Sequence, residues 1–203
     1  MRFFFKLLYH PFAFTYDLVA ATVSFGQWQN WTKTILPYIE GTRILELGFG
    51  PGHLQRILRD QGLFAAGLDE SHQMAHLAKS RLRKSGYDAA NLSRGFAQQL
   101  PFQNKAFNTV IATFPTEYIF DPRTLAEINR CLLNGGRLVV LPAAWPKRPL
   151  LVWLYKVTGE SPSAISSITK KAKPVFTNAG FDVSFKSLEV KSSMLLIVIA
   201  TKE

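Results

Sequence analysis

The sequence predicts an α/β protein built on a doubly wound, mostly parallel sheet. From residue 43 onward, short apolar or β-branched runs alternate with helical patterns, which is typical of parallel strands joined by helices. The last two apolar runs are joined by too few residues for a crossover helix, so they are expected to pair as an antiparallel hairpin. The chain is therefore predicted to form one domain, residues 1–203, with a seven-stranded sheet that ends in this hairpin.

The individual elements follow from local signals. Strands are predicted at 43–47, 65–68, 91–95, 106–113 and 137–141, and the hairpin strands at 181–188 and 193–201. Helices are predicted at 53–60, from Ser71 as a cap to about residue 85, and from Asp121 onward. Asp followed by Pro is a helix start, and Asn-Gly-Gly at 134–136 is a stop signal before the fifth strand.

Two segments lie outside this alternation. Residues 1–40 are rich in aromatic side chains and are expected to form an N-terminal cap, and residues 142–165 are expected to form an insert or lid. Ligands of open α/β sheets bind at the carboxyl ends of the strands, and the second segment leaves from the carboxyl end of the fifth strand. Both segments are therefore expected to cover a pocket.

Composition excludes several classes of protein. With 203 residues and 47% hydrophobic residues, the chain can bury a core without disulfides, and its single cysteine cannot form a disulfide framework. One cysteine and four scattered histidines are too few for a Cys/His zinc cluster, so no metal site is expected. No apolar, uncharged stretch of about 20 residues and no signal-peptide cleavage site is present, which predicts a cytoplasmic protein. A net charge of +10 favours an anionic partner.

A glycine-rich turn follows the first strand and carries the strongest functional signal. The run Glu-Leu-Gly-Phe-Gly-Pro-Gly at 46–52 places glycines at alternate positions, where a ligand must approach the backbone closely. The third glycine of a dinucleotide-binding turn would stand at His53, and Pro51 removes a backbone donor, so a ligand without phosphate is expected. Asp69 ends the second strand, where an acid accepts hydrogen bonds from ribose hydroxyls.

Together with the Gly-Gly pair before the fifth strand, these residues resemble class I S-adenosylmethionine-dependent methyltransferases over Arg43 to Leu141. The hairpin also suits that family, so the resemblance covers about four-fifths of the chain. It implies a Rossmann-like fold, S-adenosylmethionine as cofactor and S-adenosylhomocysteine as product. Within the class, the run from Tyr16 to Trp28 is similar to quinone-biosynthesis C-methyltransferases and bacterial phospholipid N-methyltransferases.

The resemblance also implies which residues hold the cofactor. The glycine turn would wrap the methionine portion, Asp69 would bind the ribose, and the segment 95–102 would line the adenine pocket. The implied cofactor-binding residues are Glu46, Gly48, Phe49, Gly50, Gly52, Asp69, Glu70, Phe96, Ala97, Gln98 and Thr113. Phe96 stands where the family commonly has an acid that receives the adenine amino group. Either Phe96 stacks on the base or Gln98 supplies the polar contact.

The acceptor is expected to be a small hydrophobic or lipid-like molecule. Glu117 and Tyr118 follow the fourth strand at its carboxyl end and are the candidate catalytic residues, with loop packing or solvation as the alternative. Methyl transfer mainly requires positioning and exclusion of water, so no metal is needed. The run from Trp145 to Lys156 combines a Lys-Arg pair with an apolar stretch and two tryptophans, which suits either a lid or a contact with an anionic membrane surface. The run 2–8 could add a second membrane anchor.

Two other functions remain open at this point. The positive charge favours a nucleic-acid methyltransferase acting on RNA, although no recognition module accompanies it. The absence of an evident base and the departure at Phe96 favour a non-catalytic S-adenosylmethionine-binding protein.

Overall fold

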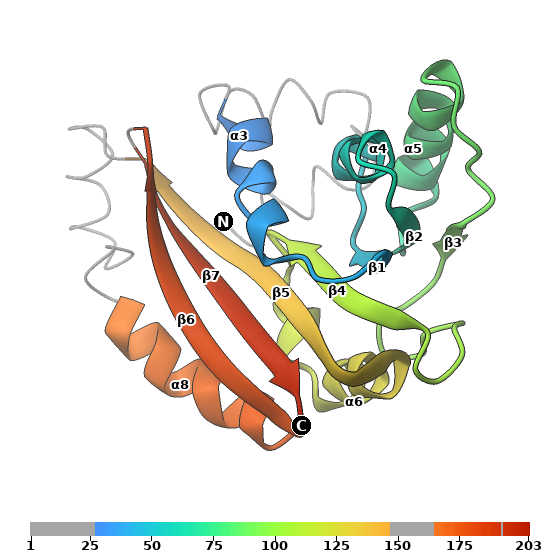
Figure 1. The fold of residues 1–203 in the computed structure, drawn as a ribbon. Helices are drawn as coiled ribbons and strands as arrows, with labels where there is room; N and C mark the ends of the chain where they lie inside the picture. Colours follow the sequence, from blue (N-terminus) through green and yellow to red (C-terminus); the bar gives the residue numbers. More distant parts are fainter. Residues whose placement is uncertain (1–26, 147–164, 192) are drawn as a thin grey trace.

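A computed structural model describes residues 27–146, 165–191 and 193–203, and its centre is a seven-stranded sheet in the order β3-β2-β1-β4-β5-β7-β6 (Figure 1). The strands are β1 (Arg43–Leu47), β2 (Phe64–Asp69), β3 (Leu92–Arg94), β4 (Phe107–Thr113), β5 (Leu132–Pro146), β6 (Phe181–Val190) and β7 (Ser193–Lys202). Strands β1 to β5 pair in parallel, and β7 pairs antiparallel with both β5 and β6. The predicted fold class, including the C-terminal hairpin, is confirmed.

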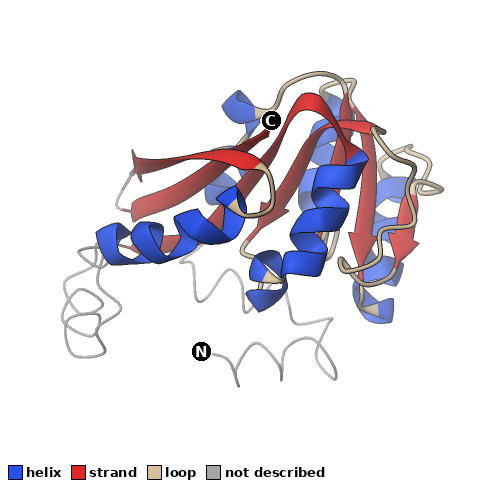
Figure 2. Cartoon of the chain, turned by 90° about the horizontal axis from the view of Figure 1, so that it is seen from below, coloured by secondary structure: helices blue, strands red, loops and turns tan. Residues whose placement is uncertain are grey.

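Helices cover both faces of the sheet (Figure 2). They are α3 (Trp28–Lys33), α4 (His53–Asp60), α5 (His72–Lys84), α6 (Pro122–Cys131) and α8 (Ile165–Thr177), with short 3₁₀ turns η2 (Leu36–Tyr38) and η3 (Glu117–Phe120). Alternate residues of β1 enter different cores: Leu45 packs in the cluster that includes α6 and α8, and Ile44 packs in the cluster that includes α3 and α4. The sheet is therefore the middle layer of three.

The predicted helix starts have the expected caps. Ser71 Oγ accepts a hydrogen bond from the backbone N–H of Met74 at the start of α5. Asp121 caps α6 by accepting from the backbone N–H of Arg123, with Pro122 at the first helical position.

Strand β5 is longer than predicted at both ends. It begins at Leu132, directly after α6, so Asn-Gly-Gly at 134–136 lies inside the strand. Gly135 has a φ of +70°, and the pairing of β4 with β5 shifts register at this point, so the turn signal produces an irregularity in the strand. At the other end, β5 continues to Pro146 because residues 143–146 pair with β7.

This extension corrects part of the expected lid. Residues 142–146 belong to the sheet, and Trp145 is only 8% exposed, so it is a core residue and not an interfacial one. The remainder of the predicted lid, residues 147–164, lies outside the described residues, as do residues 1–26 of the predicted cap.

Helix α8 was not among the predicted elements. Its buried side chains Ala172 and Phe176 pack in the same core as α6, and its exposed positions include Lys171 and Lys173. Lysines and an internal proline, Pro174, obscure the apolar face in the sequence. None of the helices in the described ranges is long and apolar enough to cross a membrane.

Candidate functional site

A cavity lies where the chain leaves the carboxyl ends of β1, β2 and β4, beside the glycine turn. The structure brings most of the predicted cofactor residues together on its wall. These are Glu46, Gly48, Phe49, Gly50, Asp69, Glu70, Phe96, Ala97, Gln98 and Thr113. Of the two candidate catalytic residues, Tyr118 lines the cavity and Glu117 does not. No group of three potential metal-ligating side chains occurs among the described residues.

Asp69 lines the cavity and accepts hydrogen bonds from two backbone N–H groups. The N–H of Gly50 donates to Asp69 Oδ2 at 2.8 Å, and the N–H of Ser71 donates to Asp69 Oδ1 at 2.9 Å. Burial raises the pKa of Asp69, and these two hydrogen bonds oppose that rise. Each carboxylate oxygen keeps further acceptor capacity, which suits a pair of neighbouring hydroxyl groups on a ligand.

The glycines of the turn have different roles. Gly50 has a φ of +53°, and a Cβ built on it would meet no atom within 4 Å, so this side of the turn is open. Gly52 has a φ of +80°, and a Cβ there would lie 2.8 Å from the Cβ of Ala78 in α5. Gly52 therefore allows the start of α4 to pack against α5 and, contrary to the expectation that it contacts the ligand, is not on the cavity wall.

Glu46 is a buried acid at the edge of the cavity. Its side chain is 2% exposed, and Gln55 Nε2 of α4 donates to Glu46 Oε2 at 2.8 Å. Burial raises the pKa of Glu46 to about 8, although the hydrogen bond from Gln55 lowers it. Sequence analysis missed Gln55. The available signal was a glutamine three residues before Leu58, on the apolar side of an amphipathic helix.

Aromatic side chains from α3 and from the loop after β4 form another part of the cavity wall. The rings of Trp28 and Phe114 lie 4.2 Å apart between centroids with planes 30° apart. Phe114 adopts a φ of +49°, which is uncommon for a residue with a Cβ, and its N–H donates to the carbonyl of Leu141. Trp28, from the described part of the expected cap, lines the cavity.

The two candidate catalytic residues are neighbours in the 3₁₀ turn η3, but only one of them lines the cavity. The hydroxyl of Tyr118 donates to the backbone carbonyl of Leu47 at 3.3 Å, which places the ring beside the glycine turn. Glu117 is exposed and absent from the cavity wall, because adjacent residues of a 3₁₀ turn point in different directions. The structure therefore does not support the predicted role of Glu117.

The loop after β3 forms another part of the cavity wall. Phe96 is 65% exposed at the cavity edge, and Gln98 Nε2 donates to Asp121 Oδ2 at 3.3 Å. Hydrogen bonds from the side chain and the backbone N–H of Arg123 lower the pKa of Asp121 to about 2. Because a carboxylate only accepts hydrogen bonds, Asp121 fixes the orientation of the Gln98 amide and leaves its carbonyl oxygen to accept from a ligand.

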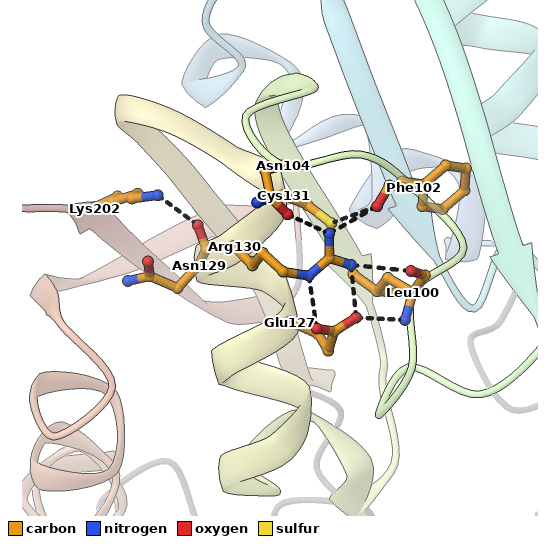
Figure 3. A network of polar contacts seen from close by, with 8 residues as sticks. All are labelled: Leu100, Phe102, Asn104, Glu127, Asn129, Arg130, Cys131 and Lys202. Carbon is orange, nitrogen blue, oxygen red and sulfur yellow. Dashed lines mark hydrogen bonds and ion pairs between the residues drawn. The ribbon is translucent and has the colours of Figure 1, made fainter.

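Arg130 of α6 anchors the loop after β3 to that helix (Figure 3). Its guanidinium donates to the backbone carbonyls of Leu100 and Phe102 and to the side chain of Asn104, and it pairs with Glu127 at 2.8 Å. Glu127 also accepts from the N–H of Leu100. The loop that carries Phe96 and Gln98 is thereby tied to α6 through charge-assisted hydrogen bonds.

Comparisons with known proteins agree with this geometry. Residues 45–140 match the family described as "Methyltransferase domain". The chain is 32% identical over 162 residues to the demethylmenaquinone methyltransferase of Lactiplantibacillus plantarum, covering 74% of this chain and 68% of that protein. The chain belongs to the class I S-adenosylmethionine-dependent methyltransferase family. The demethylmenaquinone methyltransferase of Symbiobacterium thermophilum is also 32% identical, over 149 residues.

Among solved structures, an S-adenosylmethionine-dependent methyltransferase from Aquifex aeolicus has the same fold. Its TM-score is 0.63 at 18% identity, with 87% of this chain and 93% of that chain covered. The alignment with the S. thermophilum relative covers 68% of this chain but only 59% of the relative, so the chain spans about three-fifths of that protein's length.

Proposed function

We propose that the protein transfers a methyl group from S-adenosylmethionine to a small hydrophobic or lipid-like acceptor. One observation carries this proposal: a single cavity joins the glycine turn and Asp69 to the aromatic pair Trp28 and Phe114. The glycine turn and Asp69 suit a polar cofactor, and the aromatic pair suits an apolar acceptor. The relatives named as demethylmenaquinone methyltransferases support an acceptor of quinone type.

The cavity residues fit each portion of the cofactor. Asp69, with acceptor capacity left on both oxygens, would bind the ribose hydroxyls. Glu46 and the open backbone at Gly50 would hold the methionine portion, with Gly48 and Phe49 beside them.

The proposed adenine site lacks the acid that the family commonly has at the position of Phe96, but its residues can still bind the base. Phe96 would stack on the base, and the carbonyl oxygen of Gln98 would accept from the adenine amino group, in place of the usual acid. Ala97, Glu70 and Thr113 complete the proposed cofactor site as wall residues.

When bound, S-adenosylmethionine supplies a methyl group on a positively charged sulfur, which an acceptor atom takes by in-line displacement. The chain's own contribution is to bring donor and acceptor together and to exclude water. Trp28 and Phe114 would hold the flat or apolar body of the acceptor. Tyr118, fixed beside the glycine turn by its bond to Leu47, would limit where the acceptor can lie.

A transfer assay with methyl-labelled S-adenosylmethionine tests this proposal. The acceptor panel would contain reduced quinones, phenols, amine-bearing phospholipids and RNA, and Asp69→Ala would serve as the control variant. We expect label transfer to a hydrophobic acceptor by the wild-type protein and none by Asp69→Ala. Transfer to RNA alone would replace the proposal with the nucleic-acid alternative, and cofactor binding without transfer to any acceptor would favour a non-catalytic binding protein.

We also propose that the acceptor is reached at an anionic membrane surface, on the support of the net charge of +10. Sedimentation with vesicles containing about one-third anionic lipid at low salt should remove the protein from solution, and high salt should release it. A protein that stays in the supernatant at low salt would refute this part of the proposal.

A further inference from the structure

Glu46 depends on residues of α4 that do not themselves line the cavity. Gln55 is fully buried, and its Nε2 donates both to Glu46 Oε2 at 2.8 Å and to the backbone carbonyl of Ala66 at 3.1 Å. Both N–H groups of the amide are thus in use, one of them on the acid. A buried glutamine with this many partners has a defined orientation.

Arg59, one turn further along α4, secures that orientation. Its Nη1 donates to Gln55 Oε1 and to the backbone carbonyl of Gln55, and its Nη2 donates to the backbone carbonyl of Ala65 at 2.8 Å. Because a guanidinium can only donate, the carbonyl oxygen of Gln55 must face Arg59 and its NH₂ group must face Glu46. The three side chains form a relay from the partly exposed Arg59 of α4 to Glu46 on the cavity wall.

The sheet makes room for this relay. A Cβ on Gly67 of β2 would lie 2.8 Å from Leu92 Cδ2, 2.8 Å from Phe49 Cδ1 and 3.1 Å from Gln55 Nε2. Gly67 pairs directly with Glu46 in the β1–β2 ladder. A side chain at this position would therefore press on Leu92 and Phe49 and on the amide that bonds to Glu46.

Charged groups from two elements act on Glu46, namely Asp69 of β2 and Arg59 of α4. Burial and the neighbouring Asp69 of β2 raise the pKa of Glu46, whereas the bond from Gln55 and the positive charge of Arg59 lower it, with a net value of about 8. On the other side, β4 places the uncharged Ile111 opposite Glu46. The relay therefore favours the ionised acid against the effect of burial.

We infer that Gln55 and Arg59 are positioning residues that present Glu46 as a cavity-facing carboxylate to the protonated amino group of the cofactor's methionine portion. This inference rests on the proposed function, because it requires that the cavity bind S-adenosylmethionine. Removal of either relay residue makes ionisation of Glu46 more costly without removing any group from the cavity wall. The consequence is a cofactor affinity that depends on pH in a way the relay controls.

Calorimetric titration with S-adenosylhomocysteine between pH 5.5 and 8.5 tests the inference on wild type, Gln55→Met and Arg59→Met. We expect wild-type affinity to rise with pH and to level near pH 8, the pKa of Glu46. In both variants the affinity should reach its plateau at a higher pH, because the pKa of Glu46 is higher. A rise of about one unit in that pKa weakens binding at pH 7 roughly tenfold. Binding at pH 7 should also release protons from wild type but not from Glu46→Gln.

Matched variants separate this effect from a loss of structure. Gln61→Met makes the same exchange at the exposed end of α4 and should keep the wild-type profile. In a Glu46→Gln background, Gln55→Met should cause no further pH-dependent change. Arg59 is only partly buried, so Arg59→Met keeps the test available if Gln55→Met does not fold.

The outcomes distinguish the relay from the proposed function. Variants that lose affinity by the same factor at every pH, or that keep the wild-type profile, overturn the relay while wild-type binding still supports the function. A wild-type protein that binds no S-adenosylhomocysteine at any pH refutes both.

Discussion

Exchange of single glycines for alanine separates backbone strain from ligand contact in the glycine turn. Gly50 and Gly62 have positive φ values of +53° and +74°, and a Cβ on either would meet no atom within 4 Å. They differ in location, because Gly50 lines the cavity and Gly62 follows the end of α4 away from it. Gly62→Ala is therefore a matched control for Gly50→Ala.

Both variants should lose similar stability. A left-handed conformation costs a residue with a Cβ about 1–2 kcal/mol. In a protein of this size, that cost corresponds to a fall of about 2–8 °C in melting temperature. Differential scanning calorimetry of the two variants measures this effect directly.

Only Gly50→Ala should weaken cofactor binding. Its methyl group would occupy space that the proposed methionine portion needs, and overpacking of this kind costs about 1–3 kcal/mol, or roughly 5-fold to 150-fold in affinity. Titration with S-adenosylhomocysteine should show this loss for Gly50→Ala and unchanged affinity for Gly62→Ala. Equal affinities in the two variants would refute the argument that the backbone at Gly50 meets the ligand.

Three further predictions concern the acid, the loop anchor and the cysteine. Folded Glu46 keeps its proton up to about pH 8, whereas an unfolded chain releases it near 4.5, so the folded state binds more protons in this window. The free energy of unfolding should therefore fall as pH rises from 4.5 to 8, and urea unfolding of Glu46→Gln should show a weaker fall. Arg130→Met removes the anchor of the loop after β3 and should cost about 1–3 kcal/mol of stability together with cofactor affinity; unchanged affinity would show that this loop does not hold the ligand. Burial raises the pKa of Cys131 to about 11. Iodoacetamide at pH 8 should therefore label this cysteine only after denaturation, which mass spectrometry would show. Labelling of the native chain would contradict the burial of Cys131.

Elements with strong local signals were predictable from the sequence. Strand β1 and helix α4 have the predicted bounds, because a β-branched and apolar run, three glycines and an amphipathic repeat succeed one another without ambiguity. The caps at Ser71 and Asp121 were predictable for the same reason, since the cap residue and its partner are neighbours in the chain.

Features that depend on distant partners were not predictable. The extension of β5 to Pro146 exists because β7 pairs with it, and no local pattern reports that partner. Helix α8 is defined by the burial of Phe176 against the sheet, whereas its lysines and Pro174 weaken the helical pattern.

In the candidate site too, residues with a local sequence signal were predictable and residues that act through distant contacts were not. Its glycines and Asp69 were recognised because they form a contiguous motif and a strand end. Gln55 and Arg130 were missed because their roles lie in contacts with Glu46 and with the loop at 100–104. Glu117 and Tyr118 are adjacent in sequence, and only the 3₁₀ geometry of η3 shows which of them lines the cavity.

Titration calorimetry of the wild-type protein with S-adenosylmethionine and S-adenosylhomocysteine tests the central claim most directly. We expect each ligand to bind once per chain, in the cavity beside the glycine turn. Asp69→Ala should abolish both titrations while the protein stays folded. Absence of binding by the wild type, or undiminished binding by Asp69→Ala, would contradict the assignment of this cavity to the cofactor.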